Sequence, residues 1–502
     1  MILRRMHAGV PALAACALLA ACAVGPDYQR PPPPELPAAW QTEAPWRTGT
    51  PRDADAKTDW WLRYGDTTLD GLMQLAMERN ATLDVAAARL DQARATLDAA
   101  GAAQYPQLGL GARGSRLRIS ANRPLTNYNV SNQSTVQNDY QLTLNASYEI
   151  DLAGRVRRSV EAAGASAEQS AADFQNTRLL VTAELATAYF NLRAIDTELD
   201  VVARSIALQR RALELVSARH DLGAVSGLDV AQQQALLEST LTQVDLLKRQ
   251  RGQYQDAIAT LVGTPAPAFT LAPDLREITL PPIPLGMPSD LLERRPDVAA
   301  AERAMAAANA QIGVAKAAFY PSISLAPVAL GVDSNRMAVL FDAPSMLWSV
   351  GVSATQMLFD GGRVRANVNF AAAGYQASVA SYRRVVLGAM QEAQDGITGL
   401  AALQRATAQS GNAVAAARRV LEMAAARYEG GAANFLDVIT AQQALLNSER
   451  QTAQLRGQQL QVSVFLIRAL GGDWCAAPDP AGGCPAPAAQ RLAATEGESA
   501  KR

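Results

Sequence analysis

The feature that most constrains this 502-residue chain is an internal repeat. Three short motifs occur twice in the same order, and they are Gly154-Arg155-Val156-Arg157 with Gly362-Arg363-Val364-Arg365, Leu228-Asp229-Val230 with Leu436-Asp437-Val438, and Tyr105-Pro106 with Tyr320-Pro321. The offset is 208 residues for the first two pairs and 215 residues for the third. An ordered series at a nearly constant offset predicts two tandem copies of one structural unit, over residues 66–275 and 276–472.

Both copies are expected to contain the same elements in the same order. A helix ends at Tyr-Pro, because proline lacks the N–H and disfavours helix in the residue before it. Alternating apolar and polar residues then predict a hairpin of strands, over 107–150 in the first copy and 322–358 in the second. An Asn/Ser/Thr-rich loop, 121–138, is expected inside the first hairpin. The expected helices are about 67–103, 156–221, 228–261, 289–318, 364–429 and 436–470, and the strands lie within 107–118, 140–150, 322–332 and 348–354.

The long helix of each copy is predicted to pack as a coiled coil. Neither expected long helix contains proline. Apolar residues of the second one are spaced four and three apart, at Val368, Ala372, Tyr375, Val379, Tyr382, Val386, Ala389 and Ala393. About 65 residues of helix make a rod of about 100 Å. The return helix and the helix before Tyr-Pro together have about the same length, which predicts a helical barrel wall joined to strands at one end.

The first 21 residues have the pattern of a lipoprotein signal peptide. Two arginines precede a short apolar stretch and small residues, and about 15 apolar residues are too few to cross a membrane comfortably. Leu19-Ala20-Ala21-Cys22 is similar to the bacterial lipobox, in which cleavage before the cysteine is coupled to acylation of its sulfur. The alternatives are a second match at Leu13-Ala14-Ala15-Cys16 and an ordinary signal peptide cut elsewhere. Ala23, in place of an aspartate, favours sorting to the outer membrane.

Two further cysteines lie near the C-terminus. Cys475 and Cys484 flank a Pro/Gly-rich segment and could close a small disulfide in an oxidising periplasm. Residues 22–65 are expected to form an acylated, proline-rich linker. Residues 473–502 are rich in Ala, Pro, Gly and charge, and are expected to form a disordered tail.

The composition argues against several classes of function. Lys+Arg total 46 and Asp+Glu 47, so the chain lacks the basic surface with which a nucleic-acid partner would be bound. Only two histidines occur, and His7 lies in the expected signal peptide. One remaining histidine cannot build a multi-histidine metal site, and no Ser-His or phosphate-loop constellation accompanies it. We therefore expect no metal, no cofactor and no enzymatic activity.

Four strands with one apolar face cannot seal themselves in a membrane. In hydrocarbon every backbone N–H and C=O must be paired, and a closed transmembrane barrel needs at least about eight strands. Several identical chains must therefore contribute to one barrel. The alternative is a soluble β-sandwich on a helical stalk, which needs no membrane.

Several motifs together resemble one family. They are Leu291-Leu292-Glu293-Arg294-Arg295-Pro296-Asp297-Val298-Ala299-Ala300-Ala301-Glu302, both Tyr-Pro pairs, and Cys22 followed by Gly25-Pro26-Asp27-Tyr28. From Cys22 to about Gly471 the chain is similar to the TolC-type outer-membrane factors, in the lipoprotein branch that includes OprM and NodT-like proteins. The resemblance implies an α+β membrane protein. Three copies would share a transmembrane β-barrel of twelve strands, joined to a long periplasmic barrel of antiparallel helices.

The resemblance also implies a function and partners. The chain would be the outer-membrane channel of a tripartite efflux system and would passively conduct drugs or other small molecules. Its partners would be two more copies of itself, outer-membrane lipid, a periplasmic adaptor and an inner-membrane pump of the resistance-nodulation-division type. A covalent lipid on Cys22 would be its only attached group. The alternatives are the conduit of a type I protein secretion system and a lipid-anchored periplasmic scaffold that conducts nothing.

The turns between each long helix and its return helix are the expected adaptor-docking tips. Their residues are Gly223, Ser226, Gly227, Leu228, Gly430, Gly431 and Leu436. A plain helical hairpin also needs glycine here to cap the helix, so the pattern alone does not separate the two roles.

Two equivalent aspartates follow these turns. Near the starts of the return helices they would stabilise the helix dipoles, but three copies of Asp437 around an axis would instead form a cation-attracting ring. The resemblance matches Asp437 to the acidic periplasmic aperture, and Asp229 and Tyr428 to a link that keeps the mouth closed. Ala433 and Thr440 replace an arginine and an aspartate of the family pattern, so closure is expected to depend on hydrogen bonds and packing.

Overall fold

The computed structural model describes residues 23–31, 40–41, 59–122, 134–283 and 295–472. The predictions for Cys22, for Cys475 and Cys484, and for the tail lie outside these residues. The chain divides into two compact units. We call residues 1–32, 89–171 and 300–382 the strand unit, and residues 33–88, 172–299 and 383–502 the hairpin unit.

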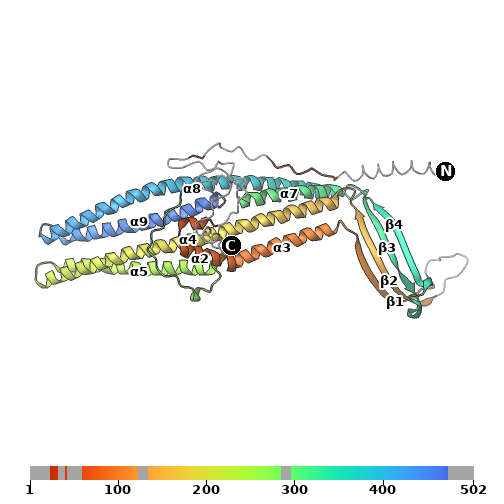
Figure 1. Cartoon of the computed structure of the whole chain (residues 1–502), viewed down its shortest axis with the longest axis horizontal. Helices are drawn as coiled ribbons and strands as arrows, with labels where there is room; N and C mark the ends of the chain where they lie inside the picture. The colour runs from red at the N-terminus through yellow and green to blue at the C-terminus, as the bar shows by residue number, and fades with distance from the viewer. Residues whose placement is uncertain (1–22, 32–39, 42–58, 123–133, 284–294, 473–502) are drawn as a thin grey trace, which may run out of the picture. The chain divides into compact units, whose positions relative to one another are not determined.

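The strand unit contains one antiparallel sheet in the order β1-β2-β3-β4 (Figure 1). Its strands are β1 (Gln107–Ile119), β2 (Thr135–Ile150), β3 (Ser322–Ser334) and β4 (Met346–Thr355). The expected loop at 121–138 was too long, because β2 begins at Thr135 and pairs with Ile119. The expected second hairpin also ends three residues early, at Thr355.

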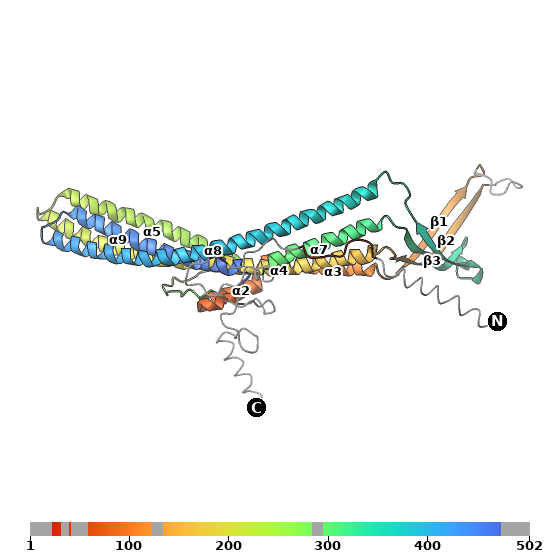
Figure 2. The ribbon, with the colours of Figure 1, turned by 90° about the horizontal axis from the view of Figure 1, so that it is seen from above.

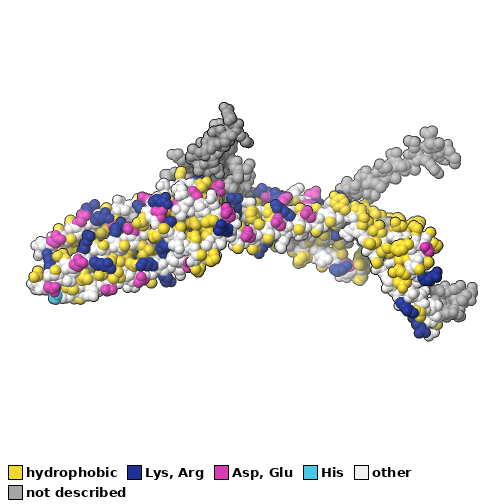
Figure 3. All heavy atoms as spheres, turned by 60° about the horizontal axis from the view of Figure 1, so that its bottom comes forward, with side chains coloured by type: hydrophobic (Ala, Val, Ile, Leu, Met, Phe, Trp, Pro, Cys, Tyr) yellow, Lys and Arg dark blue, Asp and Glu magenta, His cyan; other side chains and the backbone are white. Residues whose placement is uncertain are grey.

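The register of the sheet places apolar side chains in rows on one face. Leu110 pairs with Leu144, Leu144 with Leu330, and Leu330 with Trp348, and all four side chains are exposed. The neighbouring row is Gly109, Asn145, Ala329 and Ser349. Because side chains alternate between faces, the two rows lie on opposite sides of the sheet. Figure 3 shows hydrophobic side chains gathered over the strands, whereas charges of both signs are spread over the hairpins.

The helices of the two halves repeat in the same order. The helices of the first half are α2 (Thr67–Arg79), α3 (Ala81–Ala102), α4 (Arg155–Asp221) and α5 (Gly227–Leu261); those of the second are α7 (Pro296–Ala317), α8 (Arg363–Glu429) and α9 (Phe435–Ala469). Short 3₁₀ helices lie at η1 (Trp60–Tyr64), η2 (Ala266–Ala268), η4 (Met337–Val339) and η5 (Ala343–Ser345). Both α8 and α9 start and end 208 residues after α4 and α5. None of the described helices is long and apolar enough to cross a membrane.

The helix expected over 67–103 is interrupted, which corrects that prediction. Asn80 has an extended backbone between α2 and α3. Its Oδ1 accepts hydrogen bonds from the N–H groups of Thr82 at 2.9 Å and Leu83 at 3.2 Å. Asparagine is a favoured N-cap because its side chain satisfies N–H groups that have no partner within the helix. A new helix therefore starts after Asn80 although the sequence pattern around it stays helical.

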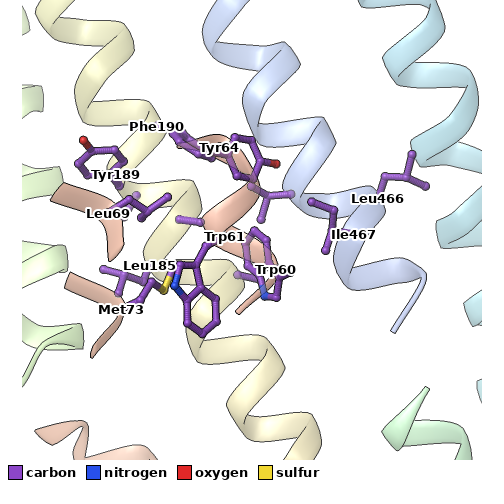
Figure 4. Packing of buried hydrophobic residues seen from close by; sticks show 14 of the residues in the cluster. Trp60, Trp61, Tyr64, Leu69, Met73, Leu185, Tyr189, Phe190, Leu466 and Ile467 are labelled. Atoms are coloured by element: carbon purple, nitrogen blue, oxygen red, sulfur yellow. The ribbon is translucent and has the colours of Figure 1, made fainter. Parts of the chain in front are cut away.

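Part of the expected linker belongs to the core of the hairpin unit. Trp60, Trp61 and Tyr64 form η1 and are buried. Figure 4 shows them packed against Leu185 and Phe190 of α4. The linker prediction for residues 22–65 is therefore wrong at η1, where three aromatic side chains anchor the segment.

Residues 23–31, also expected to be linker, pack within the strand unit against α4 and α7. A Cβ on Gly25 would lie 2.6 Å from the Cα of Gly313, so the two backbones touch. Asp27 pairs with the buried Arg158 of α4 at 2.6 Å. We call this contact region the N-terminal seat. It fixes the segment that follows Cys22 beside the start of α4.

Candidate functional site at the helix-hairpin tips

Both long helices end in the same hydrogen-bonded turn. At the first tip Gly223 has φ +75° and donates its N–H to His220 O at 2.8 Å, while Ala224 donates to Arg219 O at 2.9 Å. Gly431 has φ +73° and takes the same place at the second tip. This pair of bonds is a Schellman motif, and its left-handed residue favours glycine. Two of the predicted tip glycines are therefore required by the turn itself.

The return helices start at equivalent polar caps. Ser226 Oγ accepts from the N–H of Leu228 at 3.1 Å. Asn434 Oδ1 accepts from the N–H of Asp437 at 3.1 Å. Ser226 was among the predicted tip residues and Asn434 was not, although the 208-residue offset makes the two positions equivalent. Asp229 and Asp437 thus lie in the first turns, where a negative charge favours the helix dipole.

The two tips of one chain are held together by an apolar cluster. Its buried members are Val216 and Leu236 of the first hairpin and Tyr428, Phe435, Val438 and Ile439 of the second. The rings of Tyr428 and Phe435 lie 5.1 Å apart. The Arg219 guanidinium lies 4.9 Å from the centre of the Tyr428 ring, within the range of a cation–π interaction. Packing, rather than a salt bridge, therefore joins the tips within one chain.

The predicted link between Tyr428 and Asp229 is not formed within the chain. Tyr428 Oη is buried and has no hydrogen-bond partner among the described residues. A link of this kind would have to form between chains, so it stays a prediction.

The remaining tip residues present both charge and apolar surface to solvent. Asp437 is exposed and Asp229 is half-buried. The side chains of Leu228 and Leu436 are 63% and 48% exposed, and that of Leu222 is 84% exposed. Leu222 was missed by sequence analysis because it immediately follows the last helical residue of α4, where a leucine gives no periodic signal. Exposed leucines beside glycine turns are suited to an apolar contact with another protein.

Behind the tips, α9 is tied to both helices of the first hairpin. Figure 2 shows α5 and α9 side by side. Arg450 of α9 donates to Glu198 of α4 at 2.8 Å and to Gln243 of α5 at 3.0 Å. Glu198 is buried, so the pair is shielded from solvent. The two hairpins of one chain are therefore connected by a partly buried ion pair as well as by the tip cluster.

A second buried network holds the segment after η2 against α4 and α5. Asp196, whose side chain is fully buried, accepts from Arg251 Nε at 2.6 Å and from Arg193 Nη1 at 3.0 Å. The same arginines donate to Leu271 O at 2.7 Å and Ala272 O at 2.8 Å. The segment that connects the two halves is therefore held against α4 and α5 by hydrogen bonds from two buried, charged arginines.

The network continues into the N-cap of α2. Tyr189 Oη donates to Asp66 Oδ2 at 2.6 Å. Burial and this hydrogen bond raise the pKa of Tyr189, so its hydroxyl stays protonated and remains a donor. Asp66 Oδ1 caps α2 by accepting from the N–H of Thr68 at 2.9 Å.

Equivalent residues tie each return helix to the short helix of the same half. Asn80 Nδ2 donates to Leu261 O, the last residue of α5, at 2.7 Å. Arg295 Nη1 donates to Ala469 O, the last residue of α9, at 3.0 Å. The repeat offsets of 215 and 208 residues make Asn80 equivalent to Arg295 and Leu261 equivalent to Ala469. In the sequence Arg295 stands out only as part of the family motif, which gives no sign of this contact.

Comparisons with known proteins agree with this architecture. The description Outer membrane efflux protein belongs to a family model that matches residues 72–264 and 287–472. The toluene efflux pump outer membrane protein TtgF of Pseudomonas putida is 32% identical over 470 residues, covering 92% of this chain and 95% of TtgF. The pyoverdine export outer membrane protein OpmQ of Pseudomonas putida is 33% identical over 451 residues, covering 88% of this chain and 94% of OpmQ. The solved structure of the outer-membrane channel OprN is 31% identical with a TM-score of 0.82, covering 90% of this chain and 100% of OprN.

Proposed function

Because this chain belongs to the outer membrane efflux protein family, we propose that it is the outer-membrane channel of a tripartite efflux system. The chain is an outer-membrane protein of a Gram-negative bacterium, and the resemblance to TolC-type proteins expected from its motifs is confirmed. It acts as a passive conduit rather than as an enzyme. Its cargo is small molecules, as the names of TtgF and OpmQ indicate for those relatives.

The observation that carries this proposal is the open sheet of the strand unit, in which β1 and β4 are edge strands. Within the described residues, β1 and β4 each have one hydrogen-bonded neighbour. One face of the sheet is an exposed apolar surface, as a lipid-facing surface must be. Open edges are not tolerated in hydrocarbon, so β1 of one copy pairs with β4 of the next. Three copies would close a barrel of twelve strands.

The matched helices support a tandem duplication. Long and return helices of the two halves have equal lengths, and equivalent residues join them to the short helices. Three copies therefore supply six similar hairpins, which form a pseudo-sixfold tunnel.

The tips are the docking surface for a periplasmic adaptor. Leu222, Leu228 and Leu436 supply exposed apolar contact area, and the glycine turns let a partner approach the backbone. An inner-membrane pump of the resistance-nodulation-division type delivers the cargo. Acylation of Cys22 adds a membrane anchor, and the N-terminal seat holds the residues that follow it.

The test is conductance of the purified protein in planar bilayers. The wild type is expected to form ion-conducting trimers, and Asp437→Ala is expected to raise the conductance and weaken block by multivalent cations. Glu422→Ala, which removes another exposed acid of the second hairpin, is the matched control. A protein that inserts but passes no ions would refute the channel. Cation block equal in Asp437→Ala and wild type would remove Asp437 from the aperture.

A further inference from the structure

The hairpin unit contains a cavity of about 780 Å³ between α4, α5 and α9. Tyr254 and Leu261 of α5 line one side, and Val462 and Phe465 of α9 line another. Cavities of about 300–1,000 Å³ with mostly apolar walls and a few polar groups are typical of small-molecule sites. Its size and walls therefore suit a small organic ligand.

The cavity lies on a different face of α4 from the aromatic core. Leu185 and Tyr189 belong to the cluster that includes the tryptophans of η1 (Figure 4). Glu184, Thr187 and Asn191 line the cavity instead. The cavity borders the main core through Ala183, Ala188 and Val464, which belong to both, but no residue of η1 lines it, so a ligand could enter without unpacking η1.

Most polar groups of the lining are already satisfied. Asn191 Oδ1 accepts from Gln461 Nε2 at 2.7 Å, and Thr187 Oγ1 donates to Ala183 O at 2.7 Å. Arg468 has two partners, because its guanidinium lies 5.1 Å from the centre of the Phe465 ring and one of its nitrogens lies 3.7 Å from Glu392 Oε1. Because these groups already have partners, a ligand does not need to supply polar atoms for them.

Glu184 differs from the other lining residues. Its side chain is exposed, and it makes no ion pair or hydrogen bond within the part of the chain that the structure describes. The only cation of the lining, Arg468, is already paired. A carboxylate without an ion pair among the described residues therefore lies beside an apolar wall, and this combination is complementary to a cation with an apolar body.

We propose that this cavity binds cationic amphipathic small molecules. The apolar body of the ligand lies against Leu261, Val462 and Phe465, and its positive group pairs with Glu184. The biological role of the site rests on the proposed function, because in a tunnel with η1 on its outer side the cavity would face the path of the cargo. Binding itself needs only the folded protein.

The experiment measures binding of two fluorescent probes to purified full-length protein in lipid nanodiscs. The cationic probe is rhodamine 6G and the neutral probe is N-phenyl-1-naphthylamine. The wild type is expected to bind rhodamine 6G saturably. Glu184→Gln is expected to weaken rhodamine 6G binding about fivefold, the effect of one partly solvated ion pair, and to leave the neutral probe unchanged. Phe465→Ala is expected to weaken both probes while the circular dichroism spectrum is retained.

Glu238→Gln is the matched control, because Glu238 is an exposed glutamate of α5 outside the cavity. Equal rhodamine 6G binding by Glu184→Gln and Glu238→Gln would overturn the proposal. So would the lack of saturable binding by the wild type, which would show that a second copy or another segment of the chain covers the cavity. Conductance measured on the same samples separates this outcome from failure of the channel proposal.

Discussion

At the scale of single residues, Arg295 shows how one buried side chain can hold several elements. It donates to Asp297 at 2.7 Å, to Glu392 at 2.8 Å and to Ala469 O at 3.0 Å. Burial alone would lower the pKa of Arg295, but the hydrogen bonds and charges of Asp297 and Glu392 outweigh it and raise that pKa. The guanidinium therefore stays charged and joins α7, α8 and α9.

We predict that Arg295→Met destabilises the hairpin unit strongly. Removing one partner of a buried ion pair typically costs about 3–5 kcal/mol, and the loss here should lie toward the lower end, because Asp297 is partly exposed and Glu392 keeps Arg468 at 3.7 Å. Arg204→Met is the control, because Arg204 pairs with Asp200 on the surface at 3.2 Å and such pairs contribute about 0.2–1 kcal/mol. Thermal unfolding midpoints in detergent test the difference. Equal midpoints for the two variants would show that the contacts of Arg295 do not stabilise the hairpin unit.

Asp70 lies at a site where its charge is unfavourable. Burial and the negative charges of Asp66 and Asp59 raise its pKa above the ordinary value of 3.8. The folded state therefore holds the proton more tightly than the unfolded state. This contribution to stability is complete below pH 3.8 and is lost as the pH rises through the folded-state pKa. At neutral pH the ionised carboxylate destabilises the fold.

Asp70→Asn is accordingly expected to raise the unfolding midpoint at pH 7.5. The gain should shrink as the pH falls toward the pKa of Asp70, because the wild-type side chain then becomes neutral as well. Asp84→Asn is the control, since Asp84 is an exposed first-turn aspartate of α3. A gain that stayed constant between pH 7.5 and pH 4.5 would show that charge is not its cause.

At the scale of elements, the tips combine a local turn with contacts between hairpins. The turns need only glycine and a capping side chain, which are local features. The buried tip cluster instead depends on how the first hairpin meets the second. Tyr428 belongs to this cluster, and its hydroxyl is buried without a partner among the described residues.

We predict that Tyr428→Phe leaves the unfolding midpoint of the isolated chain unchanged or slightly higher, because it removes a buried unsatisfied hydroxyl. If the hydroxyl forms the closed-state link between chains, the same variant will raise the leak conductance of the closed trimer. Phe435→Leu serves as the comparison, because it disturbs the ring contact at 5.1 Å and should lower the midpoint. Closed-state leakage identical to wild type would exclude the Tyr428 link.

At the scale of the whole molecule, the apolar face of the sheet decides where the protein resides. Trp348 is 76% exposed and lies in the row with Leu110, Leu144 and Leu330. The next residue, Ser349, lies on the opposite face. One face is therefore suited to lipid and the other to water.

We expect Trp348→Arg to block assembly in the outer membrane, because arginine on the lipid face of a barrel costs about 2–4 kcal/mol at the midplane. Ser349→Arg should assemble and change ion selectivity, because the proposed barrel would place this opposite face toward the channel. Cross-linked trimers in the outer-membrane fraction measure assembly. Equal trimer yields for the two variants would contradict the assignment of the faces.

Sequence reasoning located the long elements closely. Both α4 and α8 begin one residue before their expected starts and end where expected. A proline-free heptad pattern bounded by glycine turns is repeated over many residues, so the helical signal is strong and local. The alternation of apolar and polar residues located the strands. Because the chain is duplicated, each element could be predicted in both halves. The tip turns could be predicted because their glycines also occur in both halves.

Other features required the tertiary structure. Helix breaking at Asn80, burial of Trp60, and the contacts of Arg295 with Glu392 and Ala469 gave no periodic signal. The cap at Asn80 is local, but the partners of Trp60 and Arg295, and the Leu261 O that Asn80 Nδ2 contacts, lie far away in the chain, so these contacts form only after the elements have packed. Element type and repeat order follow from local periodicity and turn chemistry. Which polar side chain is buried, and what satisfies it, depends on groups that only the folded chain brings within hydrogen-bond distance.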